Sequence, residues 1–433
     1  MRYAIPAVIA MTASSLYNMV DSIFIGRGVG PLAIAGLAIT FPVMNLSAAF
    51  GAMIGVGGST MISVKLGQKD NETAVRVLGN VVTLNVLLGV LFGGLAIIFL
   101  NPILRFFGAS DNTLGYAYDY MLVILLGNVV THLYLGLNSV LRAIGQPKKA
   151  MNATIATVVI NTILDPLFIY GLDMGIRGAA IATVIAQVIA LVYVWWLLSN
   201  KEQYVHLQRG IYGLRSKIVK NIIGIGLSPF CMQTCACMVV ILINTSLRTH
   251  GGDLAIGAYG IANRITFVFV MIVMGICQGM QPIAGYNYGA RQFDRVTEVL
   301  KKAIILSTIV VTIGFVVCVF TPVPIVHLFT SDPELTDISA NALRIINCLF
   351  SVVGLAMVTG NFFQSIGKAK ISIFLSTTRQ LLFLVPLLLV LPNYFGTNGV
   401  WITIPISDIL SSITAAVMLW YFYKKEGFKT NNI

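Results

Sequence analysis

Residues 32–78 decide the fold, and they read LAIAGLAITFPVMNLSAAFGAMIGVGGSTMISVKLGQKDNETAVRVL. They align without a gap, at an offset of 222 positions, with residues 254–300, LAIGAYGIANRITFVFVMIVMGICQGMQPIAGYNYGARQFDRVTEVL. Nine positions are identical, and one of them pairs Gly57 with Gly279. Beyond the block, Ile144-Gly145 matches Ile366-Gly367 at the same offset. A register held through separated segments predicts an internal duplication.

The composition indicates that this duplicated chain lies in a membrane. Hydrophobic residues make up 57% of it and charged residues only 10%, whereas soluble chains carry about 25% charged residues. Apolar runs of the roughly 20 residues needed to cross a bilayer can be placed near 3–25, 33–63, 76–100, 116–140, 151–172, 178–199, 219–246, 254–287, 302–328, 338–364, 371–392 and 399–423. Such runs are too long for barrel strands, so we expect an all-α membrane protein with about twelve transmembrane helices.

The duplication predicts two homologous lobes. Six spans in each half is an even number, so both halves enter the membrane in the same direction, and their pseudo-two-fold axis runs along the membrane normal. We expect an N-lobe of six helices at residues 1–200, a cytoplasmic linker at 201–216 and a C-lobe of six helices at 217–433. Two such halves are typical of secondary transporters.

The net charge of +12 follows the membrane topology. With a cytoplasmic N-terminus, 21 of the 28 Lys and Arg residues fall on the cytoplasmic side, four on the opposite side and three within spans. The positive-inside rule then predicts that both termini are cytoplasmic. This distribution accounts for the basic balance without nucleic acid as a partner. HExxH, Walker-type and Gly-x-Ser-x-Gly motifs do not occur in the sequence, so we expect neither an enzyme nor a resident cofactor or metal.

The few acidic residues inside spans are the candidate functional groups, because a carboxylate at membrane depth is costly unless it is paired or protonated. Asp21 shares one face of its helix with Tyr17 and Asn18, and Asn161 and Asp165 are four residues apart on another helix. Two acids that face each other would raise each other's proton affinity. The alternative is structural: Asp21 caps its helix and Asp165 satisfies the kink made by the following proline.

The second half differs chemically from the first. Ile243 and Leu387 occupy the positions that match Asp21 and Asp165, so the acid pair is expected once. Arg379 and Asp408 are instead expected to pair across neighbouring helices, either as a structural ion pair or as a switch that responds to substrate. Gln278 and Gln281 offer uncharged groups, either for helix–helix contacts or for substrate.

Several short motifs resemble one transporter family. Residues 17–26 (YNMVDSIFIG), 30–36 (GPLAIAG), 142–147 (RAIGQP) and 285–290 (GYNYGA) look like the multidrug and toxic compound extrusion (MATE) transporters, closest to the bacterial MepA-like and DinF-like branch. The motifs occur in the family's order, and twelve spans in two lobes would cover the whole chain.

The resemblance implies a cation site in the N-lobe, made by Asp21, Asn161, Asp165 and Thr183. It also implies a substrate cavity, for which the candidates are Tyr17, Asn18, Tyr120, Asn138, Gln233, Gln278 and Gln281. Pro6 falls where the first helix bends in some relatives, which makes it a candidate hinge. The chain lacks the carboxylates that NorM-type members carry on the seventh and tenth helices, so a sodium site in the C-lobe is not expected.

Together these features predict a monomeric antiporter of the bacterial inner membrane, which exchanges H+ or Na+ for amphipathic, often cationic organic compounds by alternating access. One alternative is a lipid-linked precursor flippase of the same superfamily, which would be expected to bring extra spans or a more cationic cavity. The other is an ion channel, which would need a ring of selectivity groups.

Overall fold

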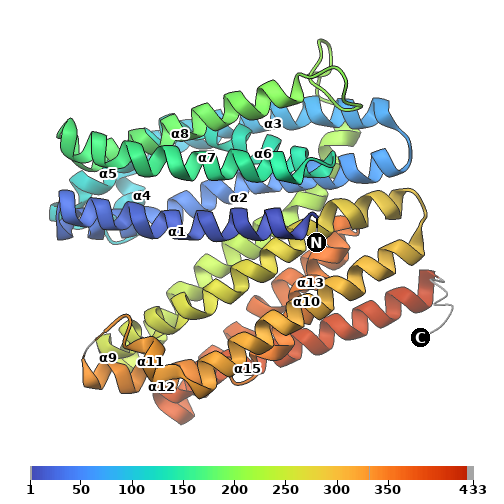
Figure 1. Cartoon of the computed structure of the whole chain (residues 1–433). Helices are drawn as coiled ribbons and strands as arrows, with labels where there is room; N and C mark the ends of the chain where they lie inside the picture. The colour runs from blue at the N-terminus through green and yellow to red at the C-terminus, as the bar shows by residue number, and fades with distance from the viewer. Residues whose placement is uncertain (1, 331, 427–433) are drawn as a thin grey trace. The chain divides into compact units, whose positions relative to one another are not determined.

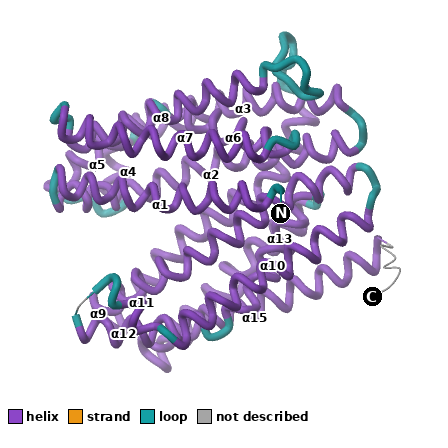
Figure 2. Tube along the Cα trace, in the orientation of Figure 1, coloured by secondary structure: helices purple, strands orange, loops and turns teal. Residues whose placement is uncertain are grey.

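The protein is described here by a computed structural model of residues 2–330 and 332–426, without the side chains of residues 16–19, 23, 27, 31, 253 and 426. Across the residues so described, the chain consists of helices and connecting loops, with no strand (Figure 2).

The first half contains eight α-helices and one π-helical segment (Figure 1). They are α1 (Ala4–Gly28), α2 (Pro31–Gly67), α3 (Asn71–Ile98), α4 (Leu100–Phe106), α5 (Asp111–Leu126), α6 (Asn128–Ala143), α7 (Pro147–Pro166), the π-helical η1 (Leu167–Gly171) and α8 (Gly175–Leu198). Apolar residues dominate on every side of the long helices, as expected for helices that contact lipid as well as protein.

The second half follows the same plan. Its elements are α9 (Ser216–Gly289), α10 (Phe293–Phe320), α11 (Pro322–Val326), α12 (Pro333–Asn347), the 3-10 segment η2 (Phe350–Val352), α13 (Val353–Ser365), α14 (Ala369–Thr377), the π-helical η3 (Thr378–Leu384) and α15 (Val385–Glu426). Two long helices are interrupted by glycines in the left-handed region, Gly252 with φ 68° in α9 and Gly396 with φ 58° in α15. Glycine adopts this conformation at little cost, so each break is a turn between two spans.

The number of spans agrees with the sequence prediction. Nine helical stretches among the described residues are long and apolar enough to cross a membrane, or eleven if the bent pairs α5 with α6 and α12 with α13 each count as one. One of the nine, Ala369–Lys425, has 57 residues, which at 1.5 Å per residue is nearly three times a hydrocarbon core of about 30 Å. If it is counted as two spans, one on either side of Gly396, the number of spans rises from eleven to twelve.

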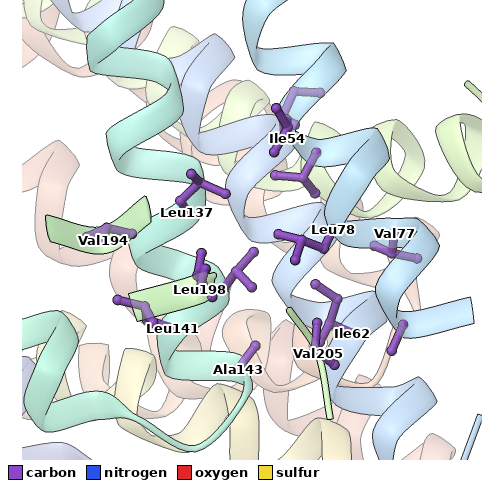
Figure 3. Packing of buried hydrophobic residues seen from close by; sticks show 14 of the residues in the cluster. Ile54, Ile62, Val77, Leu78, Leu137, Leu141, Ala143, Val194, Leu198 and Val205 are labelled. Atoms are coloured by element: carbon purple, nitrogen blue, oxygen red, sulfur yellow. The ribbon is translucent and has the colours of Figure 1, made fainter. Parts of the chain in front are cut away.

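The chain forms two compact units. One contains Ile9–Gln233, and the other combines Tyr3–Val8 with the chain from Thr234 onward. The division falls within the first helix of each half, α1 and α9, so each of these helices contributes to both units. In the unit Ile9–Gln233, a core of buried apolar side chains lies between α2, α3, α6 and α8, including Ile54, Leu78, Leu137 and Val194 (Figure 3).

The identity of Gly57 and Gly279 has a structural explanation in these two units. A Cβ on Gly57 of α2 would lie 2.0 Å from the carbonyl oxygen of Ile222, at the start of α9. A Cβ on Gly279, in the second span of α9, would lie 2.6 Å from Cα of Ala4, at the start of α1. Both glycines therefore let the first helix of one half approach the second span of the other half, backbone against backbone. The duplication thus extends to how the helices pack.

Candidate functional site

The four residues expected to form a cation site come together in the unit Ile9–Gln233. Asp21 lies on α1, Asn161 and Asp165 lie on α7, and Thr183 lies on α8. All four are buried, with exposed fractions of 5%, 1%, 0% and 7% respectively. Three helices thus enclose polar groups that water does not reach from the protein surface, where each oxygen must find a partner inside the protein.

The end of α7 has a local geometry that its sequence explains. Pro166 has no N–H to donate to the carbonyl of Thr162, and beyond it the chain widens into η1, where the N–H of Leu172 donates to the carbonyl of Leu167 at 2.9 Å. Single π-helical turns of this kind recur at functional sites. Here the widened turn begins two residues after Asp165.

Two contacts of η1 hold α1 and α8 beside α7. The hydroxyl of Tyr170 donates to the carbonyl of Phe24 on α1 at 3.0 Å. On α8, a Cβ on Gly178 would lie 2.8 Å from the carbonyl carbon of Phe168, so only glycine permits this close approach. Asp21 and Thr183 are thereby carried toward the carboxyl group of Asp165.

The carboxyl groups of Asp21 and Asp165 lie within hydrogen-bonding reach of each other. Both are acceptors when ionised, and among the described side chains neither oxygen of Asp165 has a hydrogen-bond donor, nor does Oδ1 of Asp21. The Asn161 amide donates to Oγ1 of Thr183 at 3.2 Å, while its own Oδ1 has no donor. Four buried oxygens therefore lack a donor at one place. A proton shared between the acids, or a hard cation, would satisfy them.

These side chains fit either coupling ion by the chemistry of their donors. Two carboxylates, an amide oxygen and a hydroxyl are the oxygen ligands that Na+ and other hard cations take. Among the described residues, no three His, Cys, Asp or Glu side chains form a cluster that could hold a metal ion.

The expected pair in the second half is present in the other unit. Nε of Arg379, on η3, donates to Oδ1 of Asp408, on α15, at 2.6 Å. The carboxylate side is almost completely buried, with 3% of the side chain exposed, whereas 38% of the Arg379 side chain is exposed. Arg379 lies on a π-helical segment, and Asp165 lies just before one, but the carboxylate of Asp408 has a counter-charge of its own.

The structure distributes the other candidate residues over both units. Tyr120 and Asn138 are buried in the unit Ile9–Gln233, and Tyr120, only 1% exposed, packs in an apolar core. Gln233 ends that unit, whereas Gln278 and Gln281 belong to the other, and all three are half-buried. The side chains of Tyr17 and Asn18 lie outside the described residues.

Pro6, the candidate hinge, lies in the first turn of α1, which begins at Ala4. At this position the missing N–H of proline removes no hydrogen bond from within the helix.

A buried polar cluster at the break between α5 and α6 was not predicted from the sequence. Ser47 on α2 donates to Oδ1 of Asn128 at 2.5 Å, and Nε2 of His132 lies 2.9 Å from the carbonyl oxygen of Ser47. The two helices bend by 56° at this point. Asn128 and His132 share one face of α6 because they are four residues apart, and the packing of α2 against α6 brings Ser47 to them.

A second polar group joins α6 to α7, and of its members only Asn138 was among the candidates from the sequence. Tyr134 and Asn138 on α6 contact Thr154 and Thr157 on α7 through their polar atoms. The sequence contains a pattern that indicates this group, since the polar residues Thr154, Thr157 and Asn161 recur at helical spacing ahead of Asp165. Threonine is common in transmembrane helices, so this spacing alone did not single them out.

Comparison with known proteins gives one matching family. The MatE family model matches residues 6–167 and again residues 229–390. The two matches begin 223 residues apart, one more than the offset of the 47-residue block. The internal duplication predicted from the sequence is therefore confirmed.

Curated relatives are similar over nearly the whole chain. The multidrug export protein MepA of Staphylococcus haemolyticus is 26% identical over 420 residues, which cover 97% of this chain and 92% of that protein. A MepA of Staphylococcus aureus is 28% identical over 425 residues, with the same coverage.

Solved structures share the fold. The MATE multidrug transporter DinF-BH is 38% identical with a TM-score of 0.90, over 97% of this chain and 94% of that one. An outward-facing multidrug resistance MATE family transporter of the MOP superfamily is 27% identical with a TM-score of 0.91, over 99% and 96% of the two chains.

Proposed function

Because the chain belongs to the MatE family of multidrug efflux transporters, we propose that it exports amphipathic organic compounds in exchange for a cation bound between Asp21 and Asp165. The observation that supports this proposal is the set of buried oxygens without donors at the facing carboxyl groups. Export of an organic compound alone would not require such a site, whereas exchange for a cation that binds and leaves in each cycle would.

The chemistry of the site follows from electrostatics. Two carboxylates that face each other in a medium of low dielectric cannot both be ionised without a counter-charge, because desolvation and mutual repulsion both disfavour that state. Binding one H+ makes one acid a donor to the other. Binding Na+ instead would use the same carboxylates together with the oxygens of Asn161 and Thr183.

Coupling requires that cation and drug favour different conformations of the protein. Asp21 and Asp165 lie on different helices, so loss of the cation leaves two negative charges that push α1 and α7 apart. Binding of the cation removes that repulsion. One pH unit supplies about 1.4 kcal/mol per proton, enough to shift a two-state equilibrium about tenfold.

We assign the roles of the lobes accordingly. The N-lobe, residues 1–200, carries the cation site, residues 201–216 form a cytoplasmic linker, and the C-lobe, residues 217–433, shares the substrate path through Gln278 and Gln281. The protein acts as a monomer in the bacterial inner membrane with both termini in the cytoplasm, as the positions of its Lys and Arg residues favour.

The proposal is tested in vesicles that contain the purified protein and receive either a pH gradient or a sodium gradient, with export of a fluorescent cationic dye as the readout. Asp21→Asn and Asp165→Asn each keep the shape of the side chain but remove the titrating group. Both variants are expected to lower gradient-driven export to the level of protein-free vesicles while the protein still folds.

The matched control is Asp119→Asn, which removes a carboxylate of the same unit that pairs with Arg177 at 2.7 Å on an exposed surface. This variant is expected to export at the parental rate. Export at the parental rate by both Asp21→Asn and Asp165→Asn would exclude the acid pair as the coupling site.

A further inference from the structure

A seam of polar side chains runs between α6 and α7, away from the acid pair. The hydroxyl of Thr157 lies 3.3 Å from the hydroxyl of Tyr134, and that hydroxyl lies 3.4 Å from Oγ1 of Thr154. The Asn138 amide donates to the same Oγ1 at 3.1 Å. α6 and α7 run side by side in Figure 1, so these groups form a continuous contact between them.

The α7 hydroxyls of the seam share a helix face with two residues of the proposed cation site. Thr154, Thr157, Asn161 and Asp165 lie on one face of α7, since steps of three and four residues return to nearly the same side of a helix. The eleven helical steps from Thr154 to Asp165 span about 16 Å, roughly half of a hydrocarbon core. Thr154 is seven residues, or about 10 Å, from the first residue of α7, Pro147.

Two buried acceptors in the seam lack donors. Oδ1 of Asn161 and Oδ1 of Asn138 receive no hydrogen bond from the part of the chain that the structure describes, although the two side chains are only 1% and 5% exposed. One lies beside Asp165 and the other beyond Thr154, at the two ends of the hydroxyl cluster. A buried amide oxygen in this position is a place where a water molecule binds.

The hydroxyl groups have alternative acceptors, which proton relay requires. Thr157 donates either to the carbonyl of Ala153 at 2.9 Å or to Tyr134. Thr154 contacts the carbonyl of Ala150 at 3.2 Å as well as its two partners on α6. A single hydroxyl hydrogen satisfies one acceptor at a time, so each hydroxyl can rotate from the backbone into the seam and back.

We propose that this seam carries the proton from the acid pair toward the Pro147 end of α7, which makes H+ the coupling ion. The inference rests on the proposed antiport function. A proton leaving Asp165 passes to a water on Asn161, and each hydroxyl in turn binds a proton on its oxygen and releases its own. The amides of Asn161 and Asn138 hold water and are not themselves protonated.

Charged and titratable groups lie at both ends of the seam and along it. Asp21 and Asp165 are the acids at its inner end, Tyr134 is the titratable group along it, and α8 contributes the uncharged Thr183. One turn beyond Asn138 lies Arg142, whose Nη2 donates to Ser139 at 2.9 Å. A fixed positive charge at the outer end raises the energy of a proton there, so transfer toward this end must cross an electrostatic barrier and no proton is held there.

The test uses variants that remove one hydroxyl and keep the shape, Thr157→Val, Thr154→Val and Tyr134→Phe. The control is Thr162→Val, on the same helix, because Thr162 donates to its own helix at the carbonyl of Val158, at 2.8 Å. Proton release is followed with a pH-sensitive dye inside vesicles, in H2O and in D2O. Affinity for the exported fluorescent cationic dye and the melting temperature of the protein are measured on the same preparations.

Each of the three seam variants is expected to release protons about tenfold more slowly, with unchanged substrate affinity and melting temperature, while Thr162→Val matches the parent. If the parent releases protons more slowly in D2O than in H2O, the ratio of the two rates should differ in the variants. Parental proton release in all three variants would overturn the seam. So would a parent that couples export to sodium alone, which would leave antiport itself intact. A parent that responds to neither gradient would refute the proposed function instead.

Discussion

Arg379 and Asp408 lie 2.6 Å apart, from Nε to Oδ1, with the carboxylate almost completely buried and the guanidinium partly exposed. This asymmetry means that the two residues depend on the pair differently. Arg379 can extend its charged end toward water if its partner is lost, because arginine carries its charge on a long apolar stem. Asp408 has no such freedom.

Removal of Arg379 should therefore cost more than removal of Asp408. Leaving a buried charge without its partner costs about 3–5 kcal/mol, and partial exposure of this pair favours the lower end of that range. Thermal unfolding in detergent should show a larger loss of stability for Arg379→Met than for Asp408→Asn. The double variant Arg379→Met with Asp408→Leu should recover most of it.

The same double variant separates the two interpretations of the pair. If it is stable and exports at the parental rate, the pair is structural. If it is stable but does not export, the pair is a switch that the transport cycle uses. Equal losses in the two single variants would contradict the asymmetry described above.

A second prediction concerns the hydroxyl of Thr183, which accepts a hydrogen bond from Asn161. A bare sodium ion needs neutral oxygen ligands beside the two carboxylates, whereas a proton shared between acids does not. Thr183→Val should therefore weaken sodium-driven export more than proton-driven export. The measurement compares initial export rates under the two gradients, and an equal fall under both would assign the hydroxyl a structural role.

The third prediction concerns pH and the start of α3, where Asp70 is the N-cap. Its Oδ1 accepts from the N–H of Thr73 at 3.1 Å and its Oδ2 lies 3.1 Å from Nζ of Lys65. Burial alone would raise the pKa of Asp70, but the hydrogen bonds from Thr73 and the Lys65 ammonium outweigh it and hold the pKa below its ordinary value. The ionised cap therefore stabilises the folded protein above the unfolded pKa of about 3.9.

That stabilisation is lost as the pH falls through the lowered pKa of the folded state. Asp70→Asn keeps a capping oxygen but loses the charge, so it should melt below the parent at pH 7. The difference should shrink as the pH falls below about 4, where the parent also becomes neutral. A difference that stays constant across this range would mean that the charge of Asp70 contributes nothing.

A fourth prediction tests the close helix contacts that the duplication repeats. A Cβ on Gly226, near the start of α9, would lie 1.8 Å from the carbonyl oxygen of Met53 on α2, and backbone cannot move aside cheaply. Gly226→Ala should lower the melting temperature strongly, since overpacking costs about 1–3 kcal/mol or more. Gly224→Ala, two residues earlier in the same helix, meets nothing within 4 Å and serves as the control. Similar melting of the two variants would rule out a close contact at Gly226.

Much of the architecture could be predicted because it depends on local properties. Hydrophobic length determines which segments span the membrane, and the 222-residue register shows that they form two halves. The acid pair was also predictable, because a carboxylate inside a span stands out against apolar neighbours and Asn161 and Asp165 share a helix face. The shared glycines at 57 and 279 were visible as an identity, but not as a contact.

The sequence by itself determined the number of spans, the duplication and the residue types that could bind a cation, because each depends on hydrophobicity and residue spacing along the chain. Only the tertiary structure decided which helices meet. Tyr170, on the π-helical turn after Pro166, bonds to α1, the packing of α2 against α6 brings Ser47 to Asn128 and His132, and the α6–α7 contact joins scattered hydroxyls into a seam. These contacts depend on side-chain packing between distant segments, and the period of a single helix carries no information about its neighbours.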